Sequence, residues 1–284
     1  MKKINELFFK SIILLICSYQ LDINKTYKSF LTRKKIKQCL KKYNVRNEII
    51  GFSKKYDLTG KFYYLRNTAD SECMILVNGN NLYLIFCGTQ FDLNDKVSLV
   101  KDLWTDISLG FDMLNEYGEN IGIHHTYKKN MHCENLIGQI EKIFIEHNDY
   151  DITICGHSMG CGLGTYCALY FGNKYKNINF NLVLISSPKI GNIDLKNYLY
   201  SFTNIKLYSM INNNEIVPLF PFNLFFYNYI NINKNVWKYN SDGTIEIIDE
   251  LDLSIFKSYS IKDHFTNAII GNIYNSFFIK KNFS

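Results

Sequence analysis

Gly156-His157-Ser158-Met159-Gly160 is a G-x-S-x-G pentapeptide that lies between two apolar runs. The run before it, Asp151 to Cys155, has the composition of a strand, and the run after it, Met159 to Phe171, is rich in small and apolar residues, as a buried helix is. Strand, sharp turn and helix form the context in which this motif acts as a nucleophile elbow. The glycines allow a tight bend and a close approach of strand and helix. A chance match in a glycine-rich turn is the alternative, and the flanking runs weigh against it.

Strands and helices alternate after the elbow. We expect strands at Asn181 to Ser186 and Ile205 to Ile211, a helix at Ile193 to Tyr200 and a final helix at His264 to Phe278. A helix is also expected at Leu136 to Phe144, directly before the elbow strand, because its apolar residues have helical spacing. Two hairpins are expected, one formed by Cys73 to Val77 with Leu82 to Cys87 and the other by Asn235 to Asp249. This order predicts an α/β fold with a mostly parallel central sheet and helices on both faces. Residues 21–284 contain no internal repeat or low-complexity linker and are expected to form a single domain.

The composition is that of a globular protein with a large core. Of the 284 residues, 47% are hydrophobic and 15% are aromatic, which excludes a disordered chain. The formal net charge of +6 is mild and favours anionic lipid surfaces only slightly.

The first 20 residues have the pattern of a secretory signal. Lys2 and Lys3 precede the short apolar run Ser11 to Cys17, which is too short to span a bilayer. The signal predicts a secreted protein, with a membrane-associated or cytoplasmic protein as the alternative. An apolar first helix packed on the domain is the other interpretation of this segment.

The cysteines do not have the spacing of a metal site. None of the eight forms a C-x-x-C pair or a cysteine–histidine cluster, so we expect no metal and no cofactor. Cys155, Cys161 and Cys167 flank the elbow and are expected to pack as small buried hydrophobic residues. Export of the protein would permit one or two disulfides.

A basic run extends from Thr32 to Arg46, with apolar residues at Ile36, Leu40 and Tyr43. This spacing predicts an amphipathic helix. A solvated helix face explains the charges better than nucleic-acid binding does, and no nucleic-acid partner is expected.

A nucleophilic serine needs a base, and the base needs an acid that orients it. In folds with a nucleophile elbow the chain order is serine, acid, histidine. His264 is the one histidine after Ser158, which makes it the candidate base. Glu215 directly follows the strand Ile205 to Ile211, at the end where α/β folds assemble their sites. It is therefore the candidate acid, and its competitors are Asp194, Asp242, Asp249 and Asp263.

An ester carbonyl under attack develops negative charge and needs two hydrogen-bond donors. The backbone N–H of Met159, directly after the nucleophile, is expected to be one. Thr89 is the candidate for the other, because Phe86-Cys87-Gly88-Thr89 follows an earlier strand and Gly88 permits an unusual backbone there.

The chain resembles the class 3, fungal-type lipases in a series of motifs that occur in one order along residues 70 to 270. The motifs are Phe86-Cys87-Gly88-Thr89, Leu103-Trp104-Thr105-Asp106-Ile107, Ile123-His124, the elbow, Ser186-Ser187-Pro188-Lys189-Ile190-Gly191-Asn192, Asn214-Glu215-Ile216-Val217-Pro218-Leu219-Phe220-Pro221 and Asp263-His264. The resemblance implies an α/β-hydrolase fold, hydrolysis of acylglycerols or related esters, no metal and a mobile lid.

Individual residues match the pattern of that family. Ser158 matches the nucleophile, His264 the base, and Thr89 and Met159 the oxyanion donors. Glu215 stands where the family usually has aspartate, a role that glutamate fills in other lipases.

The resemblance places the lid at Gln90 to Leu103, where apolar and polar residues are interleaved. A lid that turns its apolar face to lipid and a core helix are the two interpretations of this segment. The apolar connection Pro218 to Tyr229 is expected either to line an acyl groove or touch the lipid interface, or to form a buried loop or helix.

Together these features predict a serine ester hydrolase that cleaves acylglycerols through an acyl-enzyme intermediate. Its substrate would lie at a membrane or droplet interface, and no obligate protein partner is expected. A phospholipase A1-type activity and a non-catalytic lipase-like binding protein are the alternatives.

Overall fold

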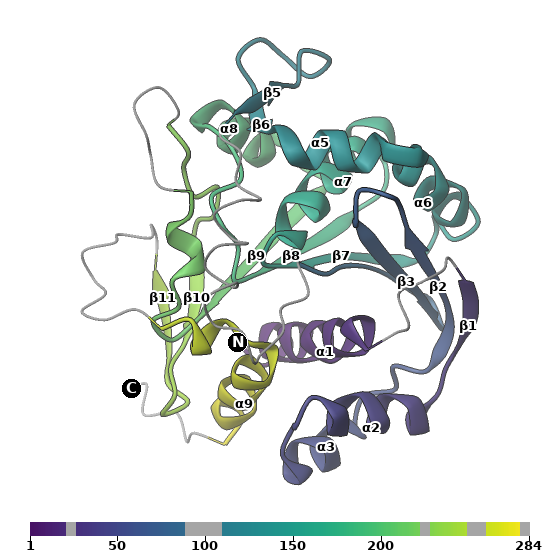
Figure 1. Ribbon diagram of the computed structural model, residues 1–284, viewed down its shortest axis with the longest axis vertical. Coiled ribbons are helices and arrows are strands. Elements are labelled where there is room, and N and C mark those ends of the chain that lie inside the picture. Colours follow the sequence, from purple (N-terminus) through teal and green to yellow (C-terminus); the bar gives the residue numbers. More distant parts are fainter. Residues whose placement is uncertain (21–26, 89–109, 222–227, 249–259, 279–284) are drawn as a thin grey trace.

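The computed structural model describes residues 1–20, 27–88, 110–221, 228–248 and 260–278. In this part of the chain the main sheet has the strand order β1-β2-β3-β4-β7-β8-β9-β10-β11 (Figure 1). The strands are β1 (Tyr27–Leu31), β2 (Gly60–Arg66), β3 (Glu72–Asn78), β4 (Asn81–Phe86), β7 (Asp151–His157), β8 (Phe180–Ile185), β9 (Ile205–Asn212), β10 (Val236–Tyr239) and β11 (Ile245–Ile248). A small second sheet pairs β5 (Phe111–Met113) with β6 (Gly122–His124).

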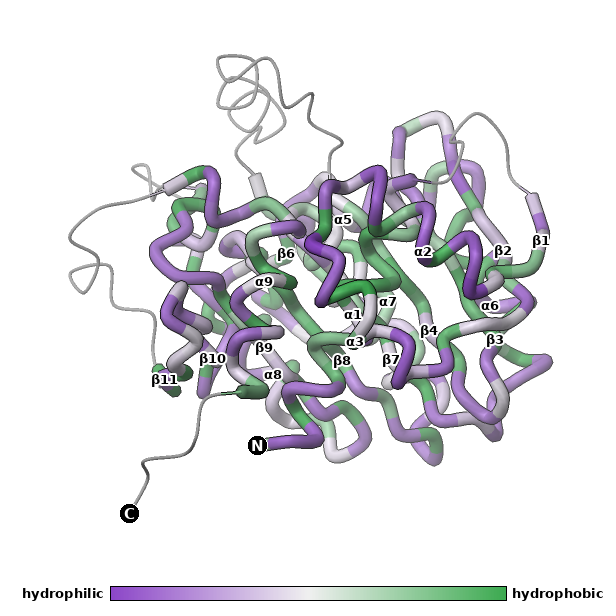
Figure 2. The backbone as a smooth tube through the Cα atoms, turned by 90° about the horizontal axis from the view of Figure 1, so that it is seen from below, coloured by the Kyte–Doolittle hydropathy of each residue, from purple (hydrophilic) through white to green (hydrophobic). Residues whose placement is uncertain are grey.

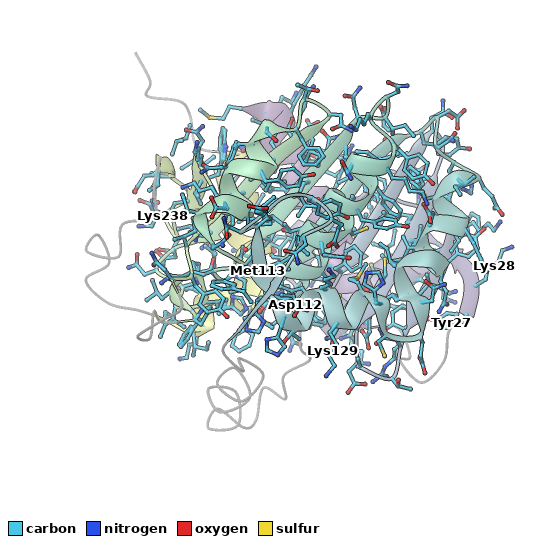
Figure 3. All side chains as sticks on the ribbon, turned by 90° about the horizontal axis from the view of Figure 1, so that it is seen from above. Tyr27, Lys28, Asp112, Met113, Lys129 and Lys238 are labelled. Atoms are coloured by element: carbon cyan, nitrogen blue, oxygen red, sulfur yellow. The ribbon has the colours of Figure 1, made fainter. Side chains whose placement is uncertain are left out.

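The five central strands, β4 and β7 to β10, are parallel, and antiparallel strands extend the sheet at both ends. The predicted parallel sheet is therefore confirmed for its centre. Strands β1 and β2 were not expected from the sequence. Lys28 on β1 and Lys238 on β10 lie at opposite ends of the molecule (Figure 3).

Two layers of helices enclose the sheet (Figure 1). One layer comprises α5 (His125–His132), α6 (Leu136–Ile145), α7 (Gly160–Lys174) and α8 (Ile193–Ser201), and the other α1 (Lys2–Tyr19), α2 (Arg33–Lys42), α3 (Asn47–Ser53) and α9 (Thr266–Ser276). Alternate residues of one strand serve the two layers: on β7, Ile154 faces the core under α7 and Cys155 faces the core under α1. Helices on both faces are as predicted.

Most of the expected elements occur within a few residues of their predicted bounds. The final helix α9 begins two residues later than predicted, because His264 ends the short 3₁₀ helix η4 (Lys262–His264) and Thr266 begins α9. Cys155, Cys161 and Cys167 are buried as predicted, and all eight cysteines are free thiols.

The N-terminal segment forms α1 and lies inside the fold. Phe8, Phe9 and Ile12 are completely buried in the core that α1 shares with α2 and α9. Asn5 Oδ1 accepts a hydrogen bond of 2.7 Å from Tyr239 Oη on β10. In this structure the segment is an apolar helix packed on the domain. Among the described residues, no helix combines the length and the hydropathy that a bilayer span requires.

The basic run forms α2, which ends at Lys42, four residues before the end of the run. Ile36 and Leu40 are buried against α1, and the exposed face carries Lys34, Lys37, Lys41 and Lys42. Figure 2 accordingly shows most of α2 as hydrophilic. This is the amphipathic helix that the sequence predicts.

The connection after Glu215 begins with the 3₁₀ helix η2 (Val217–Leu219). Val217, Leu219 and Phe220 are at most 5% exposed. The described part of this apolar connection is thus a buried element, one of its two predicted forms. Residues 222–227 and the predicted lid, Gln90 to Leu103, lie outside the described residues.

Candidate active site

Ser158 lies in a sharp turn between β7 and α7. Its φ is +55°, in the left-handed region that costs a residue with a side chain energy. The glycines on either side are required by space. A Cβ at Gly156 would collide with the backbone of Gly160 and Cys161, and one at Gly160 with the backbone of Phe86 and Cys87. Ser158 in this strained conformation, between Gly156 and Gly160, forms the nucleophile elbow that the sequence predicts.

Glu215 and His264, 49 residues apart in the chain, meet beside this elbow. Glu215 Oε2 lies 2.8 Å from His264 Nδ1, and the two residues are 1% and 2% exposed. Glu215 follows β9 in a short turn that its backbone N–H closes by donating to Asn212 O over 3.2 Å. A parallel β-bridge pairs Glu215 with Ser260, and Ser260 N–H donates to Asn214 O over 2.9 Å. This pairing holds η4, which begins two residues after Ser260, alongside the turn.

The carboxyl group of Glu215 accepts hydrogen bonds at both oxygens. Oε1 accepts from the backbone N–H of Asn212 over 2.7 Å and from Ser186 Oγ over 2.8 Å. Burial raises the pKa of Glu215, while these two hydrogen bonds stabilise its ionised form and lower the pKa. Burial also lowers the pKa of His264 to about 3, so the imidazole is neutral at pH 7. With Nδ1 bonded to the carboxyl group, a neutral ring can accept a proton at Nε2.

His157 holds the ring of His264 from the elbow side. The two rings stack with centroids 4.7 Å apart and an interplanar angle of 23°. His157 Nε2 also lies 3.1 Å from the backbone oxygen of His264. His264 is thus packed directly against the neighbour of Ser158.

Two polar atoms in this arrangement are buried and have no hydrogen-bond partner within the described part of the chain: Ser158 Oγ and His264 Nε2. An unpaired buried hydroxyl and an unpaired buried imidazole nitrogen are costly in a fold and require an explanation. These are the two atoms between which a base would take a proton from a serine nucleophile.

The loop after β4 lies against the elbow. A Cβ on Gly88 would be 2.7 Å from Ser158 Cβ and 3.2 Å from Met159 N, so only glycine allows this approach. Met159, the residue after Ser158, is the N-cap residue of α7. The other expected donor, Thr89, lies outside the described residues.

Tyr19 is a residue of this site that sequence reasoning missed. Its hydroxyl accepts a hydrogen bond of 2.9 Å from Gly88 N and lies 2.9 Å from His157 Nδ1. The one available signal was a polar ring at the end of an apolar run, which is also what a signal-peptide border looks like.

The competing acids that the structure describes, Asp194, Asp242 and Asp263, make no hydrogen bond to His264 Nδ1. Asp263 Oδ2 accepts from Asn213 Nδ2 over 3.0 Å, and Asp242 accepts from Thr244 in the turn between β10 and β11. Asp194 lies in the first turn of α8, and Asp249 lies outside the described residues.

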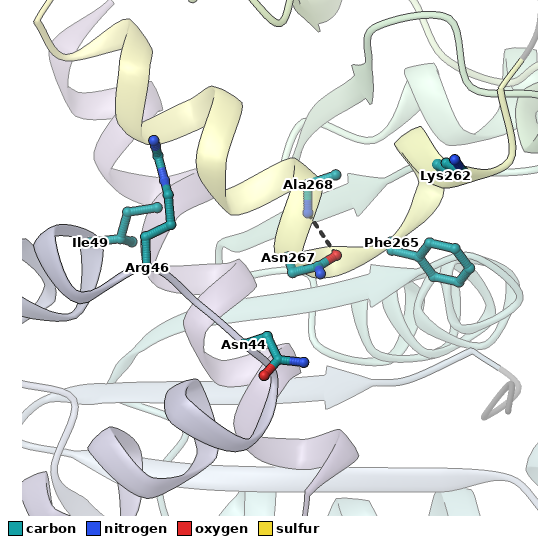
Figure 4. Close-up of a pocket in the computed structure, with 7 residues that line it drawn as sticks. All are labelled: Asn44, Arg46, Ile49, Lys262, Phe265, Asn267 and Ala268. Carbon is teal, nitrogen blue, oxygen red and sulfur yellow. Dashed lines mark hydrogen bonds between the residues drawn. The ribbon is translucent and has the colours of Figure 1, made fainter. Parts of the chain in front are cut away.

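A pocket of about 380 Å³ lies between the segment that joins α2 to α3 and the segment of η4 and α9 (Figure 4). It is lined by Asn44, Arg46, Ile49, Lys262, Phe265, Asn267 and Ala268. None of Ser158, Glu215 and His264 lines it, so we do not assign it to the reacting ester. Within the described residues, no group of three or more histidine, cysteine or acidic side chains could hold a metal ion.

Solved structures share this architecture. A lipase from Rhizopus microsporus var. chinensis superimposes with a TM-score of 0.64, at 17% identity, over 93% of this chain and 86% of that one. A propeptide complex of Rhizomucor miehei lipase gives 0.64 at 16% identity, over 94% of this chain and 80% of that one. The sheet, its helices and the elbow define an α/β-hydrolase fold.

The sequence comparisons identify the family. The model of the family described as "Lipase (class 3)" matches residues 83–225, which is half of the chain. The chain belongs to the class 3 lipase family, a family of carboxylic ester hydrolases. The resemblance seen in the sequence is therefore confirmed.

Individual relatives match over shorter segments. A secreted mono- and diacylglycerol lipase of Malassezia globosa is 25% identical over 100 residues, which are 35% of this chain and 32% of that protein. Phospholipase A1-II 1 of Oryza sativa subsp. indica is 29% identical over 99 residues, which are 34% of this chain and 25% of that protein. The matched segments thus span a third or less of these two curated relatives.

Proposed function

We propose that this protein hydrolyses the ester bonds of acylglycerol lipids through an acyl-enzyme intermediate. The single observation that carries the proposal is the hydrogen bond from His264 Nδ1 to Glu215 Oε2, made beside a serine in a strained elbow. Family membership supports ester hydrolysis of lipids, and the Malassezia relative supports an acylglycerol substrate.

In the first half of the reaction, His264 Nε2 removes the proton from Ser158 Oγ as Oγ attacks the ester carbonyl carbon. The negative charge on the carbonyl oxygen is stabilised by Met159 N–H and, as the resemblance implies, by Thr89. The bond to the alcohol oxygen then breaks, and His264 gives its proton to the departing alcohol. Glu215 keeps the imidazole in the tautomer that has a free Nε2.

In the second half, His264 removes a proton from water, which attacks the acyl-serine carbonyl. The ester bond to Ser158 breaks, Oγ regains its proton from His264, and the fatty acid leaves. We further propose that the substrate is met at a membrane or droplet interface and that the protein is secreted, as the Malassezia relative is named.

Labelling with a fluorophosphonate probe tests whether the serine is activated. We expect fast labelling and hydrolysis of long-chain esters, both lost in Ser158→Ala while the circular dichroism spectrum is unchanged. Glu215→Gln should lower kcat by about three to four orders of magnitude, as loss of the orienting acid does in serine hydrolases. A wild-type protein that neither labels nor turns over would support the non-catalytic binding protein instead.

A phospholipase A1-type activity is the second candidate, and the Oryza relative favours it. The same residues would act on a lipid with a polar head group. Initial rates on triacylglycerol, monoacylglycerol and diacylphospholipid dispersions separate the two candidates. A higher kcat/KM on the phospholipid would support the phospholipase, and a higher kcat/KM on either acylglycerol would support the acylglycerol lipase.

A further inference from the structure

Ser186 has a left-handed backbone conformation, which serine rarely adopts. It directly follows β8, is completely buried and has a φ of +57°. Ser158 directly follows β7, the neighbouring strand, with nearly the same φ. Among the described residues, all other non-glycine residues with positive φ are asparagine or aspartate, apart from Glu134. Asparagine and aspartate tolerate this region, whereas serine has no such advantage.

The backbone of Ser186 would be equally well placed as glycine. Its N–H donates to Met210 O over 2.9 Å, a bond that any residue could make. Glycine adopts positive φ without steric cost, so a serine here is strained relative to glycine. A strained residue that persists inside a core points to a use for its side chain.

The side chain of Ser186 makes one hydrogen bond, and it is to the candidate acid. Its Oγ donates to Glu215 Oε1 over 2.8 Å, on the carboxyl oxygen opposite the one that faces His264. Asn212 N–H donates to the same oxygen over 2.7 Å. Two donors on Oε1 fix the rotation of the carboxyl group and so direct Oε2 at Nδ1 of His264.

The surroundings of Glu215 make this donor important. Among the described residues, the titratable groups around it are His264 and Asp263 on η4, His157 on β7 and Cys161 on α7. The negative charge of Asp263 opposes ionisation of Glu215, and none of these described groups is a lysine or arginine. A hydroxyl that donates to the carboxylate therefore stabilises its ionised form.

We propose that Ser186 is a positioning residue for catalysis: its hydroxyl holds the Glu215 carboxylate in the orientation that receives Nδ1–H of His264. This inference rests on the proposed function for its kinetic consequence. Its structural part, the alignment of Glu215 on His264, does not depend on turnover.

The decisive variants are Ser186→Gly, which removes the strain and the hydroxyl, and Ser186→Ala, which keeps the strain and removes the hydroxyl. We expect kcat on a soluble short-chain ester to fall roughly 10- to 100-fold in both, the range for loss of one hydrogen bond to a charged group. KM should change little. Ser186→Gly should melt at a higher temperature than Ser186→Ala, because glycine relieves the backbone strain, yet the two variants should lose the same activity. If the role were merely structural, the activity of the two variants would follow their stability.

Two further measurements complete the test. The apparent pKa of the Glu215–His264 pair, read from the acidic limb of kcat/KM, should rise in both variants, because the anionic pair loses a donor. The downfield proton resonance of His264 Nδ1–H, assigned by its loss in Glu215→Gln, should shift or broaden whether or not the protein turns over ester. Ser187→Ala is the matched control, because Ser187 is the next residue, is also buried, and its Oγ donates to Pro188 O over 2.9 Å rather than to Glu215. It should leave kcat, the apparent pKa and the resonance unchanged.

The outcomes are distinct. Wild-type kcat, pH profile and Nδ1–H resonance in Ser186→Gly would overturn the inference. Absence of turnover in the wild type, with a resonance that moves in Ser186→Gly, would overturn the proposed function and leave the alignment by Ser186 supported.

Discussion

The hydroxyl of Tyr19 lies 2.9 Å from Nδ1 of His157 and thereby joins the first helix of the chain to the nucleophile elbow. Burial lowers the pKa of His157 well below its usual range, so its ring is neutral and carries one N–H. Nε2 must hold that proton, because its partner is the carbonyl oxygen of His264. Nδ1 therefore accepts from Tyr19, and the Tyr19 oxygen accepts from Gly88 N–H. The direction of this chain of hydrogen bonds is therefore fixed, from Gly88 in the loop after β4 to the backbone oxygen of His264.

Tyr19→Phe should therefore disturb two loops at once. The variant leaves Gly88 N–H and His157 Nδ1 without partners, and we expect the free energy of unfolding to fall by about 1–3 kcal/mol. We also expect kcat to fall by roughly tenfold or more, because the loop at Gly88 and the ring behind His264 lose their common anchor. Chemical denaturation and single-substrate kinetics measure the two effects.

Tyr239→Phe is the control for Tyr19→Phe. Tyr239 also has a buried hydroxyl that binds α1, but it donates to Asn5 at the opposite end of that helix. It should lose a similar amount of stability and keep its kcat. Equal kinetic losses in the two variants would show that α1 acts only through stability.

Helix α1 should be indispensable for folding. Phe9 is completely buried and packs edge-on against Phe52 and Phe277, with ring centroids 5.3 and 5.7 Å away. Phe9→Ala should lower the free energy of unfolding by about 3–5 kcal/mol, the usual result of emptying a core aromatic site. A chain that starts at residue 21 should show no cooperative thermal transition.

The control for Phe9→Ala is Phe30→Ala on β1, where the side chain is 54% exposed. Its stability should stay within about 0.5 kcal/mol of the wild type. A truncated chain that melts like the full one would instead favour the secretory-signal interpretation of residues 1–20.

The strain at Ser158 can be measured by a pair of inactive variants. Because φ is +55°, Ser158→Gly should be more stable than Ser158→Ala by about 1 kcal/mol. At Ser209, a buried serine inside β9, the order should be reversed, since glycine weakens a regular strand. Denaturation of the four variants gives both differences. If Ser158→Ala were as stable as Ser158→Gly or more stable, the elbow would not be strained.

The sequence was sufficient for the elbow, the parallel centre of the sheet and the pair Glu215 and His264, because each depends on local pattern or on chain order. It was insufficient where a contact joins distant segments and either partner has an ordinary local explanation. Ser186 looks like the end of a strand, and only the fold brings it to Glu215. Tyr19 ends an apolar run that a signal peptide explains equally well. Strands β1 and β2 form one antiparallel edge whose pairing is set by register rather than by composition.

The pH dependence of activity should respond to Asp263. Its carboxylate accepts from Asn213 Nδ2 over 3.0 Å, and its charge raises the pKa of Glu215. Asp263→Asn removes that charge, so the ionised form of Glu215 becomes easier to reach. The apparent pKa of the Glu215–His264 pair should fall, and the acidic limb of kcat/KM should move to lower pH. The kcat at the optimum should stay within about threefold, because Asp263 does not bond the imidazole that transfers the proton. Asp242→Asn, in a distant turn, should leave the profile unchanged. A kcat reduced by orders of magnitude in Asp263→Asn, with the limb in place, would transfer the role of orienting acid from Glu215 to Asp263.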